Sequence, residues 1–247
     1  MDSQTIKVLI AILGGLIPSL VWLFFWLRED DEHPEPKPKG LILITFIIGM
    51  ASVILIVPLE QMARGNGHDS PTLTVVWAAL EELIKYAAVA VIALKSRGIR
   101  EPVDYPIYFM VAALGFASLE NTLFLIHPLT VNDTTVSLLT TGSLRFLGAN
   151  LLHSASSGIV GIALGLSYYK GWLEQKIHLV LGLLTAVTLH SVFNFFIMSK
   201  DQNLFAIYGF LWVATIIIML LFEKLRRMKG EAMLGPKVIA QLEPEMN

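Results

Sequence analysis

Ionisable and polar residues interrupt four long apolar stretches of this chain of 247 residues. A charged side chain at the centre of a bilayer costs about 2.5–3.5 kcal/mol on insertion scales, so such residues generally face a protein interior and carry a function. Four separate stretches are too many to be an accident of composition. The residues concerned are Glu81, Glu82, Lys85, Glu120, His153, His190 and Asn194.

These side chains supply the groups that metal-assisted hydrolysis of a peptide bond needs. Two imidazoles and one carboxylate can hold Zn²⁺ and leave an open position for water. The bound metal then activates that water and polarises the scissile carbonyl. We expect Glu120, His153 and His190 to be the metal ligands. Glu81 or Glu82 is then the general base, and the sequence does not choose between them.

Helical spacing adds two further members to the predicted catalytic group. Lys85 lies four residues after Glu81 and three after Glu82, so it can share a helix face with either carboxylate. Asn194 lies four residues after His190 and can orient that histidine or stabilise an oxyanion. The chain has no cysteine, which excludes a thiolate metal site.

The composition indicates that lipid is the solvent of this chain. Hydrophobic residues make up 55% of it and charged residues only 15%, against about 25% charged residues in an ordinary soluble domain. The net charge of −2 gives no sign of a nucleic-acid partner. A transmembrane helix needs about 20 largely apolar residues. We therefore predict an all-α, polytopic membrane protein of about seven spans, at residues 6–27, 41–62, 73–94, 106–126, 144–168, 177–197 and 204–222.

The polar residues fall at similar depths of four consecutive predicted spans. Taking about 1.5 Å of rise per residue, Glu81, Glu120, His153 and His190 each lie roughly 9–13 Å below the outer surface. We therefore expect these four helices to bring their carboxylates and imidazoles into one layer. Small residues around His153, including the Gly161 and Gly165 pair, would let its helix approach its neighbours closely.

Loop charges predict the orientation of the chain. Most of the 18 Lys and Arg residues fall in the loops on one side of the membrane, which places the N-terminus outside and the C-terminus in the cytoplasm. We expect one transmembrane domain over residues 1–228 and a flexible cytoplasmic tail over residues 229–247. The oligomeric state cannot be read from the sequence.

Four motifs in order carry a resemblance to a known family. Glu81-Glu82-Leu83-Ile84-Lys85 is similar to an EExxK motif, and Phe116-Ala117-Ser118-Leu119-Glu120 to an FxxxE motif. His153 takes the place of the third motif, and His190-Ser191-Val192-Phe193-Asn194 is similar to a terminal HxxxN/D motif. Together with the acidic, proline-alternating residues 26–36, the chain resembles the PrsW family of intramembrane proteases, which is related to the type II CAAX prenyl proteases.

The resemblance implies a multi-pass protease of the plasma membrane. Its activity would be glutamate-dependent, metal-assisted cleavage of a membrane-anchored protein or peptide, with site-1 cleavage of an anti-sigma factor as the family example. The metal would be Zn²⁺ on the chemistry of the predicted ligands.

Two other classes of function are open at this point. A proton- or ion-coupled transporter also uses chains of Glu and His, although such proteins commonly contain inverted repeats, and the sequence has no clear repeat. A non-catalytic membrane scaffold of the same superfamily would use the polar network for packing alone. The scaffold hypothesis predicts that histidine variants lose stability, whereas the protease hypothesis predicts that they lose turnover.

Overall fold

The computed structural model of the chain describes residues 2–30, 37–65, 70–130, 135–198 and 204–242. The described residues form seven helices and confirm the prediction of an all-α fold. Their order and bounds are α1 (Ser3–Asp30), α2 (Lys39–Arg64), α3 (Pro71–Ile92), α4 (Asp104–Thr130), α5 (Thr135–Leu166), α6 (Trp172–Met198) and α7 (Leu204–Leu242).

Among the described residues, six of these helices are long and apolar enough to cross a membrane. The helix that falls outside this set is α3, which has 22 residues and is long enough at about 1.5 Å per residue. It differs because it carries three charged side chains, Glu81, Glu82 and Lys85. All three are buried inside the protein. The charges of α3 therefore face the protein interior, as the bilayer requires.

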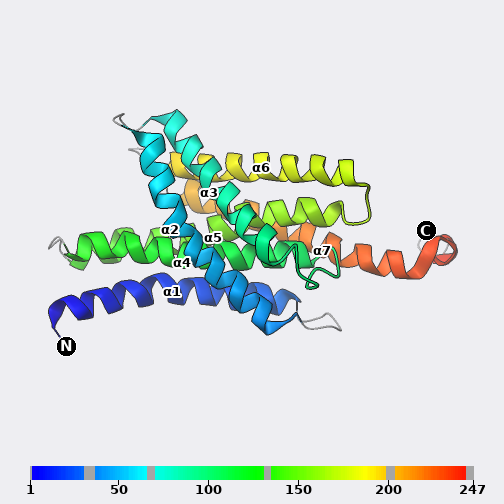
Figure 1. The fold of residues 1–247 in the computed structure, drawn as a ribbon, viewed down its shortest axis with the longest axis horizontal. Coiled ribbons are helices and arrows are strands. Elements are labelled where there is room, and N and C mark those ends of the chain that lie inside the picture. The colour runs from blue at the N-terminus through cyan, green and yellow to red at the C-terminus, as the bar shows by residue number, and fades with distance from the viewer. Residues whose placement is uncertain (1, 31–36, 66–69, 131–134, 199–203, 243–247) are drawn as a thin grey trace.

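The helices are arranged in two directions. Figure 1 shows α1, α4, α5, α6 and α7 running close to the long axis of the molecule, with α2 and α3 crossing this bundle obliquely. The two ends of the chain lie at opposite ends of the long axis (Figure 1), which suits an odd number of crossings. Which end faces the cytoplasm remains a prediction.

Two parts of the sequence prediction concern segments at the ends of helices. The acidic, proline-alternating residues 31–36 lie outside the described residues. Helix α7 continues to Leu242, well past residue 229, where we expected a tail to begin. The division into a transmembrane domain and a flexible tail remains a prediction.

Helix α4 is the centre of the bundle. It is buried without interruption from Ile107 to Ala117, and it packs mainly against α1, α2 and α5. Small residues make this close packing geometrically possible. A Cβ atom on Gly49 of α2 would overlap the backbone of Ala112, and one on Gly115 of α4 would overlap the backbone of Phe46. Small residues at a crossing let two helix backbones approach closely. Such close packing holds helices together in lipid, where the hydrophobic effect does not drive their association.

The glycines of α5 have the role that the sequence predicted for them. A Cβ atom on Gly161 would overlap the backbone of Pro106 at the start of α4. A Cβ on Gly165 would stand 2.5 Å from the carbonyl oxygen of Pro102. Helix α5 is thereby held against α4, which brings His153 beside Glu120.

Substitution of Gly49 by alanine tests this packing. We expect Gly49→Ala to lower the free energy of unfolding by about 1–3 kcal/mol, because the added methyl group meets backbone that cannot turn away. The readout is the apparent melting temperature of the purified protein in detergent. The matched control is Gly209→Ala in α7, where a Cβ would have nothing within 4 Å. Equal melting temperatures for the two variants would contradict the close α2–α4 crossing.

Candidate metal centre

Helix α3 turns its polar side chains inward because they share one face. Its buried residues include Ala78, Glu81, Glu82, Lys85 and Ala88, and the spacing of three and four residues defines one side of a helix. Glu81 and Glu82 are adjacent in sequence, so their side chains leave the helix roughly 100° apart. The two carboxylates consequently enter different surroundings.

The carboxylate of Glu82 is fully engaged by its neighbours. Its Oε1 atom accepts hydrogen bonds from Lys85 Nζ at 2.7 Å, from His190 Nδ1 at 2.8 Å and from Ser156 Oγ at 2.9 Å. Its Oε2 atom accepts one from Ser157 Oγ at 2.9 Å. Glu82 therefore ties α3 to α5 and α6 at one point.

Lys85 lies at the base of the same cluster and is fully buried. Besides its bond to Glu82, its ammonium donates to Nδ1 of His153 at 2.9 Å and stands 4.8 Å from the centre of the Phe116 ring. It is 3.8 Å from Oε2 of Glu81. One cation thus serves both glutamates, as the spacing in the sequence allowed.

The two histidines are held in defined tautomers by these contacts. An ammonium can only donate, so His153 Nδ1 accepts from Lys85, and His153 Nε2 carries the proton that it donates to Glu120 Oε2 at 2.8 Å. His190 donates its Nδ1 proton to Glu82, which leaves Nε2 with a free lone pair. Fixing one imidazole nitrogen on a carboxylate to present the other is how metal-ligating histidines are commonly oriented.

Glu81 stands between the two histidines. Its Oε2 atom is 3.7 Å from Nε2 of His190 and 3.9 Å from Nδ1 of His153, and the two imidazole rings are 5.2 Å apart. This oxygen is buried and has no hydrogen-bond partner among the described residues. A buried polar atom without a partner is costly, so its position needs an explanation.

A divalent metal ion would supply that explanation. Glu81, His153 and His190 are all buried, and each offers one ligand atom within 4.8 Å of the others. Ligand atoms bound to a single tetrahedral Zn²⁺ stand roughly 3.3 Å apart, so small side-chain movements would bring the three together. Coordination by His153 would replace one of its present hydrogen bonds. The residues fit a metal.

The candidate centre opens into a cavity of about 490 Å³. Glu81, His153 and His190 line it, together with Glu120 and Asn194. The side chain of Glu120 is 34% exposed, whereas that of Glu82 is fully buried. Glu120 and Asn194 can therefore contact a substrate and water, whereas Glu82 is buried behind the residues that line the cavity.

Glu60 is a cavity residue that the sequence reasoning missed. It reaches the cavity from α2, on the same wall as Trp77 of α3, whose indole N–H donates to the Glu60 carbonyl oxygen at 3.1 Å. The signal was available, because Glu60 is the only ionisable residue within the predicted span 41–62. It was not among the predicted site residues because it lies near the end of that span, where a carboxylate resembles an interfacial residue.

The structure confirms that the four predicted helices bring their polar residues together. Glu81, Glu82 and Lys85 of α3, Glu120 of α4, His153 of α5 and His190 of α6 form one connected cluster. Asn194 lies on the same cavity without a described hydrogen bond. Which residue acts as ligand and which as base remains a prediction.

A buried Glu–His–His group within a fold of several membrane-spanning helices has the composition that an intramembrane metal-dependent hydrolase needs. The family model of the PrsW family intramembrane metalloproteases matches residues 37–222, most of the chain, and the chain belongs to that family. Membership makes it an intramembrane metalloprotease. Family membership therefore favours the protease over the transporter and the non-catalytic scaffold.

Several proteins called Protease PrsW are similar to the chain over nearly their whole length. The protein of Shouchella clausii is 24% identical over 224 residues, covering 87% of this chain and 95% of the relative. That of Halalkalibacterium halodurans is 26% identical over 215 residues, covering 82% and 93%. That of Bacillus subtilis is 22% identical over 204 residues, covering 81% and 88%. No solved structure matches the chain significantly.

The ion pair of Glu82 with Lys85 gives a test of the cluster. We expect Glu82→Gln to lower the free energy of unfolding by about 3–5 kcal/mol, because it removes the carboxylate that lies nearest to a buried ammonium. Adding Lys85→Met should recover part of that loss, and melting curves of the single and double variants measure it. Glu223→Gln, at an exposed glutamate, is the control. The cluster is wrong if Glu82→Gln melts like this control.

Proposed function

We propose that the chain is a zinc-dependent endopeptidase that cuts membrane-anchored proteins in the cavity lined by Glu81, Glu120, His153 and His190. The observation that supports this most strongly is the Glu81 oxygen, which is buried, has no hydrogen-bond partner among the described residues and faces one nitrogen of each histidine. A donor set of two imidazoles and one carboxylate is typical of catalytic zinc.

The geometry favours a division of roles that differs from the one proposed from the sequence alone. There, Glu120 was a ligand and Glu81 or Glu82 was the base. Here Glu81, His153 and His190 are the proposed ligands, because they form the buried group. Glu82 is unsuited to be the base, since four donors occupy its carboxylate. Its proposed role is to orient His190.

Glu120 has the position that a general base needs. It lines the cavity, is partly exposed, and is hydrogen-bonded to His153 beside the proposed ligands. A metal held there would lower the pKa of a water molecule and polarise the peptide carbonyl. Glu120 would accept the proton of the attacking water and return it to the leaving amine.

Asn194 and Lys85 complete the proposed machinery. The amide of Asn194 lies on the cavity and can donate to the carbonyl oxygen as negative charge develops there. Lys85 does not line the cavity, and its ammonium balances the charge of Glu82 from behind the site. We place it among the positioning residues.

The substrate is proposed at two levels. A catalytic cavity inside a multi-pass protein suits a substrate that is itself held in the membrane. The resemblance of the four motifs to the PrsW family implies, more narrowly, site-1 cleavage of a membrane-anchored anti-sigma factor.

Metal content tests the centre itself. We expect about one zinc per chain in the purified wild-type protein, by mass spectrometry. Glu81→Gln and the double variant His153→Ala/His190→Ala should each contain almost none. His178→Ala, outside the cluster on the exposed start of α6, is the control and should retain the metal. Stable proteins without metal in every sample would refute the metal centre.

The roles of Glu81 and Glu120 are separated by measuring cleavage beside metal content. We expect Glu120→Gln to keep its metal and to lose cleavage by about a hundredfold or more, as loss of a general base does. Glu81→Gln should lose both. Cleavage is followed on a co-expressed panel of single-span proteins tagged at both ends. Metal lost in Glu120→Gln and kept in Glu81→Gln would restore the roles proposed from the sequence.

A further inference from the structure

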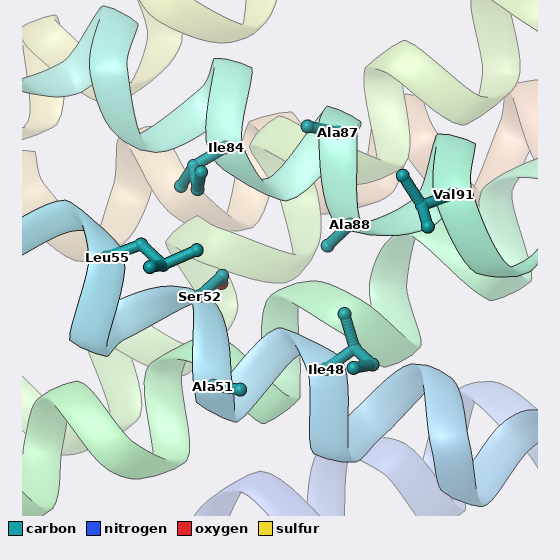
Figure 2. A pocket seen from close by; sticks show the side chains of 8 residues that line it. All are labelled: Ile48, Ala51, Ser52, Leu55, Ile84, Ala87, Ala88 and Val91. Carbon is teal, nitrogen blue, oxygen red and sulfur yellow. The ribbon is translucent and has the colours of Figure 1, made fainter.

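A second concave feature lies between α2 and α3, on the surface that faces lipid. It is a groove of about 240 Å³. In Figure 2, Leu55 and Ile84 stand at one end, and Ser52 and Ala88 lie in the middle. The hydroxyl of Ser52 donates to the carbonyl oxygen of Gly49 in its own helix at 2.6 Å. None of the described residues that line the groove is charged, and its surface is apolar.

The groove and the catalytic cavity share the same pair of helices. Along α2, Glu60 of the cavity follows Leu55 of the groove by five residues, or roughly 7.5 Å. Along α3, Glu81 precedes Ile84 by three residues, or roughly 4.5 Å. The groove and the cavity share no lining residue, but the groove begins within about one and a half helical turns of the cavity on both helices.

We propose that this groove docks the transmembrane helix of the substrate and so delivers one end of that helix to the cavity. The proposal rests on the proposed function above, and it adds the place where substrate binds. A polypeptide that crosses the hydrocarbon core has to be helical there, because its backbone groups must be satisfied internally. It reaches a cavity within the membrane from the side, and the groove lies beside that cavity on the same two helices.

The shape of the groove favours a helix over a lipid acyl chain as the occupant. Four small residues form its centre: Ala51, Ser52, Ala87 and Ala88. Helices associate in lipid chiefly by close backbone approach at small residues, and an acyl chain gains nothing particular from them. From residue 48 to residue 55 the groove extends about 10.5 Å, or two helical turns. That length matches about two successive small-xxx-small spacings of a partner helix, each of which spans about 6 Å.

The position of the groove also sets where the substrate is cut. Ser52 lies eight residues before Glu60, and Ala88 lies seven residues after Glu81. The docked face and the candidate centre are thus roughly 10–12 Å apart along the helices. Substrates should carry small residues on one helix face, with the cleaved bond about seven or eight residues further toward the cavity.

Docking is tested first, without any requirement for cleavage. A photo-crosslinking amino acid replaces Ala87 in the inactive Glu120→Gln protein, reconstituted in vesicles. The probes are two synthetic helices of about 21 apolar residues, one with alanines at every fourth position and one with leucine throughout. We expect the alanine-faced helix to be captured several-fold more and Ala51→Trp to abolish capture. The same crosslinker at Leu184, on an exposed part of α6, should capture both helices equally.

Two outcomes overturn the proposal. If the crosslinker at Ala87 captured the alanine-faced and the all-leucine helix equally, as is expected at Leu184, the groove would not select a helix. Capture of a photoactivatable phospholipid in place of either helix would assign the groove to lipid. Neither result bears on metal content, so failure of the docking proposal and failure of the metal centre remain distinguishable.

Turnover gives the second measurement. Ala51→Trp and Ala87→Trp fill exposed positions of the groove and should keep the zinc content of the wild type. Their KM for a cleaved single-span protein should rise about tenfold, the effect of losing about 1.4 kcal/mol of helix association, with kcat unchanged. Leu184→Trp should leave KM at the wild-type value. A wild-type KM in both groove variants would contradict the proposal.

Discussion

The structure depends on one buried carboxylate, that of Glu82. An ionised group in a protein surrounded by lipid is tolerated only when donors satisfy it. Lys85 from the same helix, two serines from α5 and His190 from α6 supply them. Because those donors lie on three helices, satisfying one carboxylate fixes α3, α5 and α6 relative to one another. The site is therefore assembled by the same interactions that stabilise the bundle.

This constraint also separates the two neighbouring glutamates. Adjacent residues leave a helix in different directions, so when Glu82 points into the core, Glu81 points toward the cavity. The core glutamate takes one nitrogen of His190 and leaves the other facing Glu81. Two identical neighbouring residues thus have unlike surroundings. Glu82 accepts from four donors, whereas one oxygen of Glu81 has no hydrogen-bond partner among the described residues.

The sequence predicts the helices and their convergence because charges inside apolar spans are expensive and must meet. It does not predict which of the two glutamates, Glu81 or Glu82, points into the core and which lines the cavity. That choice depends on Ser156 and Ser157, which read in the sequence only as small residues that permit close packing, yet donate to both oxygens of Glu82. Glu60 was not among the predicted site residues for a related reason. A carboxylate near the end of a span resembles an interfacial residue, and only the fold shows that Glu60 lines the cavity.

Hydrolysis inside a membrane needs water at the peptide bond and a dry surface for the helix that carries it. Helices α2 and α3 provide both by dividing their length. Toward one end of the pair, Glu60, Arg64 and Trp77 form a polar cavity wall. Further along, small and aliphatic residues form the groove, where an exposed charge would be costly. Since both helices cross the bundle obliquely (Figure 1), a helix docked along them as proposed would also cross it obliquely.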